Sequence, residues 1–316
     1  MKIVVFGTGP FCVPTLNSLA QSNHEILAVV TRPIDDAGKR RKTVANPVRE
    51  TAEKLNLEIL DPASCNAADF VQSLQSFNAD LFFVCDYGQI MSRKCLATAR
   101  LGGINLHGSL LPKYRGAAPI QWAIYNGDQE IGVTVIHMTP KMDAGPCLTN
   151  ASIQLEGTEN AEQVETQLSE LGIATVHQAI EVLSSWDGQS ELGTVQDPEQ
   201  ATPAPRIQKS DGKIDFGRTA KQIVNQIRAF TPWPTSFCQW SHGKQPLRII
   251  VHKASVQQIE TDAPPGTIVA VDKKLLAIQT GKHAMILETV QPAGKKAMPV
   301  ADFLRGNSLQ VGQMMD

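Results

Sequence analysis

The sequence predicts an α/β protein with a doubly wound, mostly parallel sheet, followed by a small β-barrel. Short apolar runs alternate with helical patterns through residues 1–187, as in successive βαβ units. Residues 188–206 are polar and rich in Gly, Gln and Pro, which is typical of a linker. Short strand patterns separated by turn signals follow in residues 207–316, which favours a barrel of the oligonucleotide-binding (OB) type.

The strands of the first domain are predicted from short apolar runs, and its helices from helical periodicity. The runs at residues 2–6 and 81–85 are apolar throughout, as in parallel strands that are buried on both faces. The predicted strands are 2–6, 25–31, 57–60, 81–85, 101–106, 131–138 and 148–155. The predicted helices are 11–20, 47–55, 67–77, a short one capped by Ser92, 117–125 and 160–186.

The second domain is predicted to open with a helix and to continue as short strands. Residues 219–230 have helical periodicity and end at Pro232-Trp233-Pro234. The predicted strands are 236–240, 247–254, 266–271, 275–279 and 284–290, with a closing helix at 300–304.

Composition excludes several classes of protein. The six cysteines are scattered without a CxxC pair, which argues against a disulfide framework and a zinc site and fits a reducing compartment. No spacing of histidines and carboxylates is typical of a metal site, so we expect no metal. No apolar run reaches membrane-spanning length, and Met1–Gly7 looks like a first strand instead of a signal peptide. We expect a cytoplasmic monomer without membrane contact.

Charge is divided unevenly along the chain. Residues 207–316 carry 14 Lys and Arg against 8 Asp and Glu, whereas residues 1–206 carry 15 against 23. A basic second domain favours a polyanionic partner, although charged residues can also segregate on solvated faces by chance. In the acidic part, Lys39-Arg40-Arg41-Lys42 stand in a long loop without apolar periodicity. We interpret this run as a loop that binds nucleic-acid phosphates, with a solvated basic loop as the alternative.

The candidate site centres on Asn105 and His107. They end the strand pattern at 101–106, before the loop Gly108-Ser109-Leu110-Leu111-Pro112. Side chains two residues apart on an extended segment share a face, and open α/β sheets bind ligands at the carboxyl ends of their strands. The structural alternative is a buried histidine beside a turn asparagine. The paired polar groups, the glycines and an acidic turn at Asp143 favour a site.

The residue types point to direct transfer of a carbonyl unit to an amine. Asn105 can donate hydrogen bonds, His107 can donate or accept a proton, and Asp143 can orient a histidine or move protons. An oxyanion then needs preorganised donors. Ser109 is not in a GxSxG elbow, so acyl-enzyme chemistry is disfavoured. The first turn, Gly7-Thr8-Gly9-Pro10, lacks the third glycine of a dinucleotide fingerprint, which disfavours a nicotinamide cofactor.

These motifs resemble the 10-formyltetrahydrofolate-dependent formyltransferases over nearly the whole chain. The resemblance is carried by Asn105-x-His107 with Ser109–Pro112, by Arg115-Gly116-Ala117-Ala118-Pro119-Ile120-Gln121, and by Met142-Asp143-x-Gly145. It extends to Tyr87-Gly88-x-Ile90, Arg228-x-Phe230-x-Pro232-Trp233-Pro234 and residues 291–298. These C-terminal motifs are most similar to those of members that act on methionyl-tRNA. Asp86 stands where the family usually has a small apolar residue.

The resemblance implies a function for each motif. Asn105 and His107 would stabilise the oxyanion, and Asp143 would orient His107 and help to move protons. The cofactor, 10-formyltetrahydrofolate, would donate the formyl group to the amine of initiator methionyl-tRNA. The folate site would be lined by Ser109, Leu110, Leu111, Pro112, Asp86, Tyr87, Gly88, Gln89 and Ile90. The tRNA would be bound by Lys39, Arg40, Arg41, Lys42, Lys209, Lys213, Lys295 and Lys296.

Two other functions remain open from the sequence. One is a formyltransferase or hydrolase that acts on a small molecule, which would share the three polar residues but would not need a basic second domain. The other is a nucleic-acid-binding protein on a catalytically inactive α/β scaffold, which would keep the basic residues and could lose Asn105, His107 and Asp143.

Overall fold

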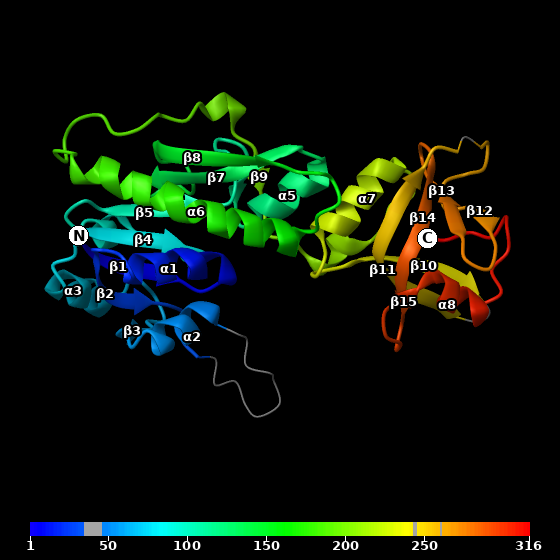
Figure 1. Cartoon of the computed structure of the whole chain (residues 1–316), viewed down its shortest axis with the longest axis horizontal. Helices are drawn as coiled ribbons and strands as arrows, with labels where there is room; N and C mark the ends of the chain where they lie inside the picture. Colours follow the sequence, from blue (N-terminus) through cyan, green and yellow to red (C-terminus); the bar gives the residue numbers. More distant parts are fainter. Residues whose placement is uncertain (35–45, 243–244, 260) are drawn as a thin grey trace. The chain divides into compact units, whose positions relative to one another are not determined.

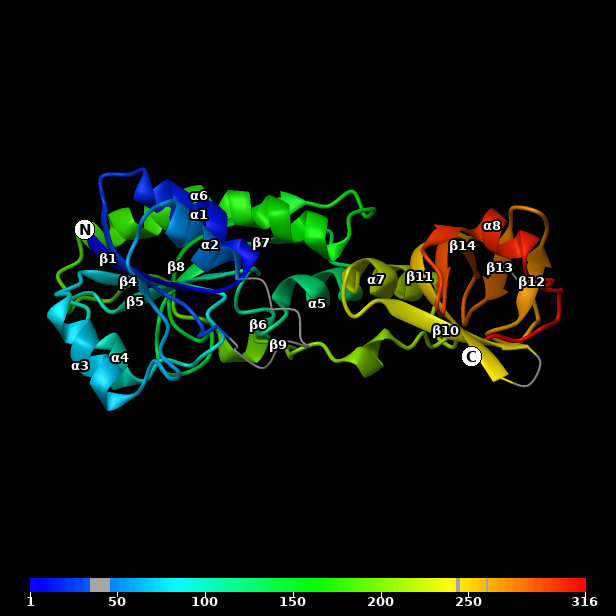
Figure 2. The same cartoon turned by 90° about the horizontal axis from the view of Figure 1, so that it is seen from below.

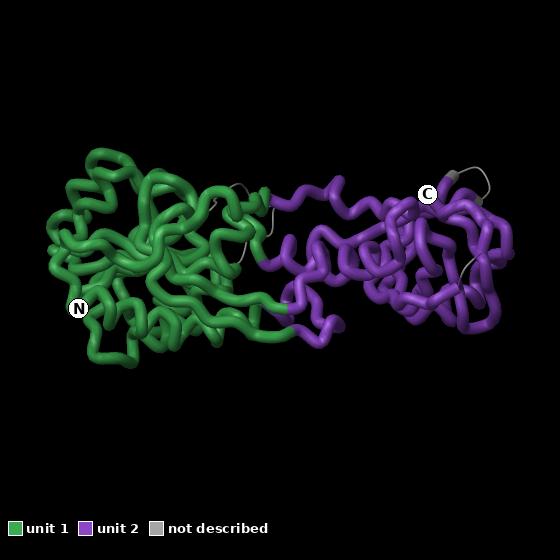
Figure 3. Tube along the Cα trace, turned by 90° about the horizontal axis from the view of Figure 1, so that it is seen from above, with its two compact units in different colours: residues 1–119, 130–154, 165–205 green, residues 120–129, 155–164, 206–316 purple. Residues whose placement is uncertain are grey.

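The computed structural model describes residues 1–34, 46–242, 245–259 and 261–316. The run Lys39–Lys42 lies outside these ranges. The chain forms two compact units, which interleave along the sequence (Figure 3). The first comprises residues 1–119, 130–154 and 165–205, and the second comprises residues 120–129, 155–164 and 206–316. Within the described ranges, no helix combines the length and apolar character needed to cross a membrane.

The first unit contains a seven-stranded sheet in the order β3-β2-β1-β4-β5-β7-β8 (Figure 1). The strands are β1 (Lys2–Gly7), β2 (Glu25–Val30), β3 (Ile59–Leu60), β4 (Leu81–Cys85), β5 (Gly103–His107), β7 (Glu130–His137) and β8 (Cys147–Gln154). Pairing is parallel from β3 through β5 and antiparallel between β5, β7 and β8. The predicted mostly parallel sheet and its seven strands are confirmed.

Helices cover both faces of this sheet. They are η1 (Pro10–Cys12), α1 (Val13–Ala20), α2 (Pro47–Lys54), α3 (Ala68–Ser76), α4 (Arg93–Leu96) and α6 (Ala161–Ser184). On one face, a Cβ at Gly172 of α6 would lie 2.6 Å from Leu106 Cδ2, so the missing side chain lets α6 pack closely on β5. On the other face, Gly103 lies against Leu96 of α4. Because side chains alternate along β5, Asn105 and His107 share the face of Gly103.

Part of the predicted linker forms structure with the first unit. Pro203–Ala204 (β9) pairs in parallel with Arg115–Gly116 (β6), and η2 (Pro198–Gln200) precedes it. Cys147 and Thr194 also exchange two backbone hydrogen bonds of 2.8 Å. β6 and β9 are only two residues long and do not lie in an apolar run, which explains why sequence patterns did not predict them.

The second unit contains an antiparallel sheet in the order β10-β11-β14-β13-β12 (Figure 2), and β15 pairs with β14 (Figure 1). Its strands are β10 (Ser236–His242), β11 (Gln245–Gln257), β12 (Ile268–Val271), β13 (Leu276–Gln279), β14 (Ala284–Pro292) and β15 (Met298–Pro299). The C-terminal segment pairs with both end strands, because Trp240 bridges to Met315 and Thr267 bridges to Met314. The sheet therefore curls around on itself, as the barrel prediction requires.

The core of the second unit lies between this curled sheet and its helices. These are η3 (Lys209–Gly212), α7 (Ala220–Ala229) and α8 (Val300–Arg305). Most of α5 (Pro119–Asn126) also belongs to this unit. Thr219 begins α7 with a capping box to Gln222. The helix then buries Ile223 and Ile227 in the core that includes Trp240 and Phe303. Trp122 and Tyr125 of α5 pack on Phe230, with ring centroids 6.5 and 5.5 Å away.

We expect Ile227→Ala to lower the free energy of unfolding by about 3 kcal/mol, because the cavity forms in a fully packed core. Ile227 is 1% exposed. Chemical denaturation followed by tryptophan fluorescence measures the change, and Lys221→Ala on the exposed face of the same helix is the control. Equal stability of the two variants would contradict the assignment of this face to the core.

Candidate active site

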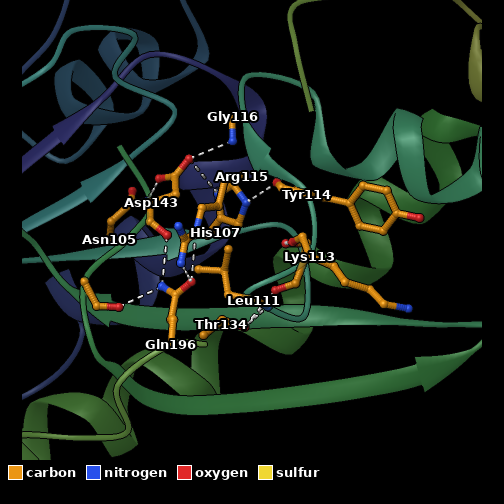
Figure 4. A network of polar contacts seen from close by, with 12 residues as sticks. Asn105, His107, Leu111, Lys113, Tyr114, Arg115, Gly116, Thr134, Asp143 and Gln196 are labelled. Carbon is orange, nitrogen blue, oxygen red and sulfur yellow. Dashed lines mark hydrogen bonds and ion pairs between the residues drawn. The ribbon is translucent and has the colours of Figure 1, made fainter. Parts of the chain in front are cut away.

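The site begins at the carboxyl end of β5. Asn105 pairs with Val84 of β4 on one side and with Ile136 of β7 on the other, so its position is fixed by two ladders. His107 ends the strand and is 5% exposed. Figure 4 shows both side chains on the same face of β5, beside Asp143.

A backbone carbonyl fixes the orientation of His107. Its Nε2 lies 2.8 Å from the carbonyl oxygen of Tyr114. A carbonyl can only accept, so Nε2 carries the proton in this hydrogen bond. Nδ1 therefore faces Asp143 Oδ2, at 3.7 Å. That separation is too long for a direct hydrogen bond and leaves Nδ1 available to a ligand atom.

Asp143 is held by the main chain of a different segment. Its Oδ2 accepts a 2.9 Å hydrogen bond from the Gly116 amide, and its Oδ1 lies 3.4 Å from Asn105 Nδ2. Its φ of 48° lies in the left-handed region, which Asp tolerates better than most residues. The structure thus brings together the three polar side chains on which the sequence analysis centred.

Gln196 supports the Asp143 turn and was assigned no role from the sequence. It lies in the segment predicted to be a linker and is 7% exposed. Its Oε1 accepts from Arg115 Nε and Nη2, at 3.0 and 2.7 Å. Its Nε2 donates to the carbonyls of Asp143 and Gly145, at 2.9 and 2.7 Å (Figure 4). Because a guanidinium only donates, the orientation of this amide is fixed.

The loop after β5 is tied to the neighbouring strand. Ser109 is 3% exposed, and its hydroxyl donates to the Lys113 carbonyl at 2.6 Å. Thr134 of β7 donates to the Ser109 carbonyl at 2.7 Å and accepts from the Leu111 amide at 3.1 Å. Leu110, Leu111 and Pro112 are half-buried, so this loop offers a partly apolar surface on a fixed backbone.

The loop after β4 divides into anchoring and exposed residues. Tyr87 is 6% exposed and packs edge-on to Phe6, with ring centroids 5.3 Å apart. Gln89 Oε1 accepts from the Cys65 amide at 2.9 Å. Asp86, Gly88 and Ile90 are exposed, and Ile90 is 62% exposed. The side chains of Asp86 and Ile90 are free to meet a ligand, whereas those of Tyr87 and Gln89 shape the loop.

The candidate nucleic-acid residues lie on the surface of the second unit. Lys209 begins η3 and Lys213 follows it, while Lys295 and Lys296 stand in the turn between β14 and β15. All four are exposed. Across the described ranges, the side chains offer no group of three or more His, Cys, Asp and Glu arranged to hold a metal ion.

Family models identify both parts of the chain. The formyl transferase model matches residues 1–180, and the formyl transferase C-terminal domain model matches residues 206–308. A methionyl-tRNA formyltransferase of Rhodopirellula baltica is 40% identical over 325 aligned residues, which cover 100% of this chain and 96% of the relative. The chain belongs to the methionyl-tRNA formyltransferase family. It is therefore a transferase, and the resemblance of its motifs is confirmed.

Solved structures share the fold of this family member. WlaRD, a sugar 3N-formyl transferase solved with dTDP and 5-N-formyl-THF, has a TM-score of 0.65 and 18% identity over 94% of this chain and 99% of that chain. HypX from Aquifex aeolicus, solved with tetrahydrofolic acid, has a TM-score of 0.62 and 16% identity over 96% of this chain and 47% of that chain. At these identities the likeness shows the fold alone.

We expect Gln196→Ala to lower the rate of formyl transfer by about 10- to 100-fold, because Asp143 would lose a support that fixes its position. Steady-state kinetics and a melting curve check this. Gln200→Ala, an exposed residue of the same segment, is the control and should keep full activity. Full activity of Gln196→Ala would show that the Asp143 turn is fixed without this amide.

Proposed function

We propose that the chain transfers the formyl group of 10-formyltetrahydrofolate to the α-amino group of methionine on initiator methionyl-tRNA. The single observation that carries the chemistry is the convergence of Asn105, His107 and Asp143 at the carboxyl end of β5. The choice of acceptor is supported by the name of the 40%-identical relative, which aligns over the full chain. The choice of donor is supported by the folates in the two solved structures.

In the proposed reaction, the amine attacks the formyl carbon directly. A carbon–nitrogen bond to the amine forms, the bond to folate N10 breaks, and the proton lost by the amine is balanced by the one that N10 gains. Asn105 Nδ2 and, when protonated, His107 Nδ1 donate to the oxyanion of the tetrahedral intermediate. Asp143 stabilises the positive charge of His107 and accepts or passes on the proton of the amine.

The neighbouring nucleophiles support a mechanism without a covalent enzyme intermediate. The Ser109 hydroxyl donates to the Lys113 carbonyl, and no histidine among the described residues is its hydrogen-bond partner. Burial raises the pKa of the Cys147 thiol, and the Arg115 guanidinium only partly opposes this shift. A thiol with a raised pKa is protonated at neutral pH and is a poor nucleophile.

The residues near the site fit a folate. A bound 10-formyltetrahydrofolate would supply the formyl group as its reactive carbon. Leu110, Leu111 and Pro112 would face its rings with half-buried apolar surface, and Ile90 would add an exposed apolar side chain. Asp86, Tyr87, Gly88, Gln89 and Ser109 complete the proposed folate site, with Tyr87, Gln89 and Ser109 shaping its backbone.

For the tRNA, we propose a basic domain at 207–316 and a catalytic domain at 1–187, joined by residues 188–206. Lys209, Lys213, Lys295 and Lys296 would contact phosphates, which position a nucleic acid without reading its sequence. The run Lys39, Arg40, Arg41 and Lys42, outside the described residues, would add a basic loop. An enzyme that acts on a small molecule would not need these cations. We also propose that the protein acts as a cytoplasmic monomer.

We expect His107→Ala to abolish formyl transfer with little loss of tRNA binding, because the imidazole acts on the reacting carbon and not on phosphates. Transfer from labelled 10-formyltetrahydrofolate and a filter-binding assay measure the two properties. His24→Ala is the control: His24 precedes β2 at the amino-end edge of the sheet, opposite the site. Retained transfer by His107→Ala would contradict its role.

The same assay tests the acceptor. Wild-type protein should formylate methionyl-tRNA far faster than a small amine at equal concentration. A preference for the small amine would favour the small-molecule alternative.

We expect Lys295→Glu with Lys296→Glu to weaken tRNA binding at least tenfold. The slope of the logarithm of the binding constant against the logarithm of the salt concentration should become shallower by about one unit per lost phosphate contact. Charge reversal of Lys39–Lys42 should act in the same direction. Titration at several salt concentrations measures both effects. The matched control reverses Lys273 and Lys274, an exposed pair in the turn between β12 and β13. If both pairs of substitutions weakened tRNA binding equally, the effect would be one of overall charge and not of phosphate contacts at Lys295 and Lys296.

A further inference from the structure

Asp86 occupies a position level with His107. The parallel ladder between β4 and β5 ends at Val84 and Asn105; Asp86 then comes directly after β4, and His107 is the last residue of β5. β4 and β5 are neighbouring parallel strands, so both residues stand at the same carboxyl-end edge of the sheet. Asp86 is thus the first residue after β4 at the edge where the candidate active site lies.

The backbone at Asp86 turns its side chain toward the β1–η1 turn. Its φ of 51° lies in the left-handed region. A Cβ at Gly9 would lie only 2.6 Å from Asp86 Oδ2, so a larger residue there would displace the carboxylate. Non-glycine residues with this backbone are uncommon and often mark functional sites. Tyr114 and Asp143, both part of the active site, also have a positive φ.

The carboxylate of Asp86 has no role in holding the described fold together. Among the described residues it makes no hydrogen bond or ion pair, unlike Asp143. Asp86 is exposed, but its carboxylate lies against the backbone of Gly9. These surroundings raise the pKa of Asp86 by desolvation, and the nearby His107 is the one charge that opposes this rise. A cationic ligand would stabilise the ionised form of a carboxylate in such a setting.

We infer that Asp86 binds the amino group of the formyl acceptor and holds its nitrogen beside His107, an inference that rests on the proposed function. A substantial share of the reacting α-amino groups arrives as ammonium near neutral pH, because peptide α-amino groups have a pKa of about 7.7–8.0 and an ester lowers this only moderately. It is the one positive charge that the acceptor brings to the reacting carbon. The carboxylate orients this group until its proton is lost and the lone pair can attack.

The alternative ligand is the donor itself, through the amino group and ring N–H of its pterin, as in the folate site proposed above. We thereby move Asp86 from that site to the acceptor. Adjacency to His107 favours the acceptor, because His107 faces the reacting carbon and its oxyanion in the proposed reaction. The two ligands are distinguished by which Michaelis constant a variant changes, so the pterin is an outcome of the test below.

Asp86→Asn is the decisive variant, because Asn keeps the size of the side chain and tolerates the left-handed backbone equally well. Full-length protein is assayed with methionyl-tRNA varied at saturating 10-formyltetrahydrofolate, and with the donor varied at saturating methionyl-tRNA. We expect kcat/KM for methionyl-tRNA to fall by about 10- to 100-fold, as when a charge-assisted hydrogen bond is lost. KM for the donor and the affinity for uncharged tRNA should not change.

Asp69→Asn, which alters an exposed carboxylate of α3, is the matched control and should keep wild-type kinetics. Unchanged acceptor kinetics in Asp86→Asn, or a rise in donor KM without a change for the acceptor, would overturn the inference. A wild-type protein that fails to formylate methionyl-tRNA would instead overturn the proposed function, so the two failures are distinct.

Discussion

The hydrogen bond from His107 Nε2 to the Tyr114 carbonyl determines how the candidate site can work. At 2.8 Å it occupies one ring nitrogen and leaves the other, Nδ1, facing Asp143. A backbone acceptor is a permanent partner, since it neither titrates nor changes rotamer. One ring nitrogen of the imidazole is therefore held by the fold, and the other is available for chemistry. The proposed oxyanion contact and the electrostatic support from Asp143 both depend on this division.

The geometry is assembled from segments that are distant in the sequence. β5 supplies Asn105 and His107, the following loop supplies the Tyr114 carbonyl and the Gly116 amide, and the turn after β7 supplies Asp143. Gln196 then fastens that turn to Arg115 through four hydrogen bonds. Non-glycine residues with a left-handed backbone stand at three places in or beside the site, Asp86, Tyr114 and Asp143. Such conformations persist where the surrounding structure over-determines them.

Sequence patterns predicted what depends on local periodicity. Apolar runs located all seven strands of the first sheet, and the two-residue spacing of Asn105 and His107 placed both side chains on one face. They could not predict Gln196, because a lone glutamine in a polar segment looks the same whether it is solvated or buried. Nor could they separate the residues of the β4 loop, where Gln89 bonds to the Cys65 amide while Asp86 has no described partner. These differences arise from tertiary contacts and have no local pattern.

The orientation of His107 can be measured directly by long-range ¹⁵N–¹H correlation NMR on protein labelled with ¹⁵N-histidine. The chain has seven histidines, so the signals of His107 are assigned by their loss in His107→Asn. The account predicts that in the neutral ring Nε2 carries the proton and Nδ1 does not. A neutral ring with its proton on Nδ1 would contradict the account, because Nε2 could then not donate to the Tyr114 carbonyl and the reactive nitrogen would be misassigned.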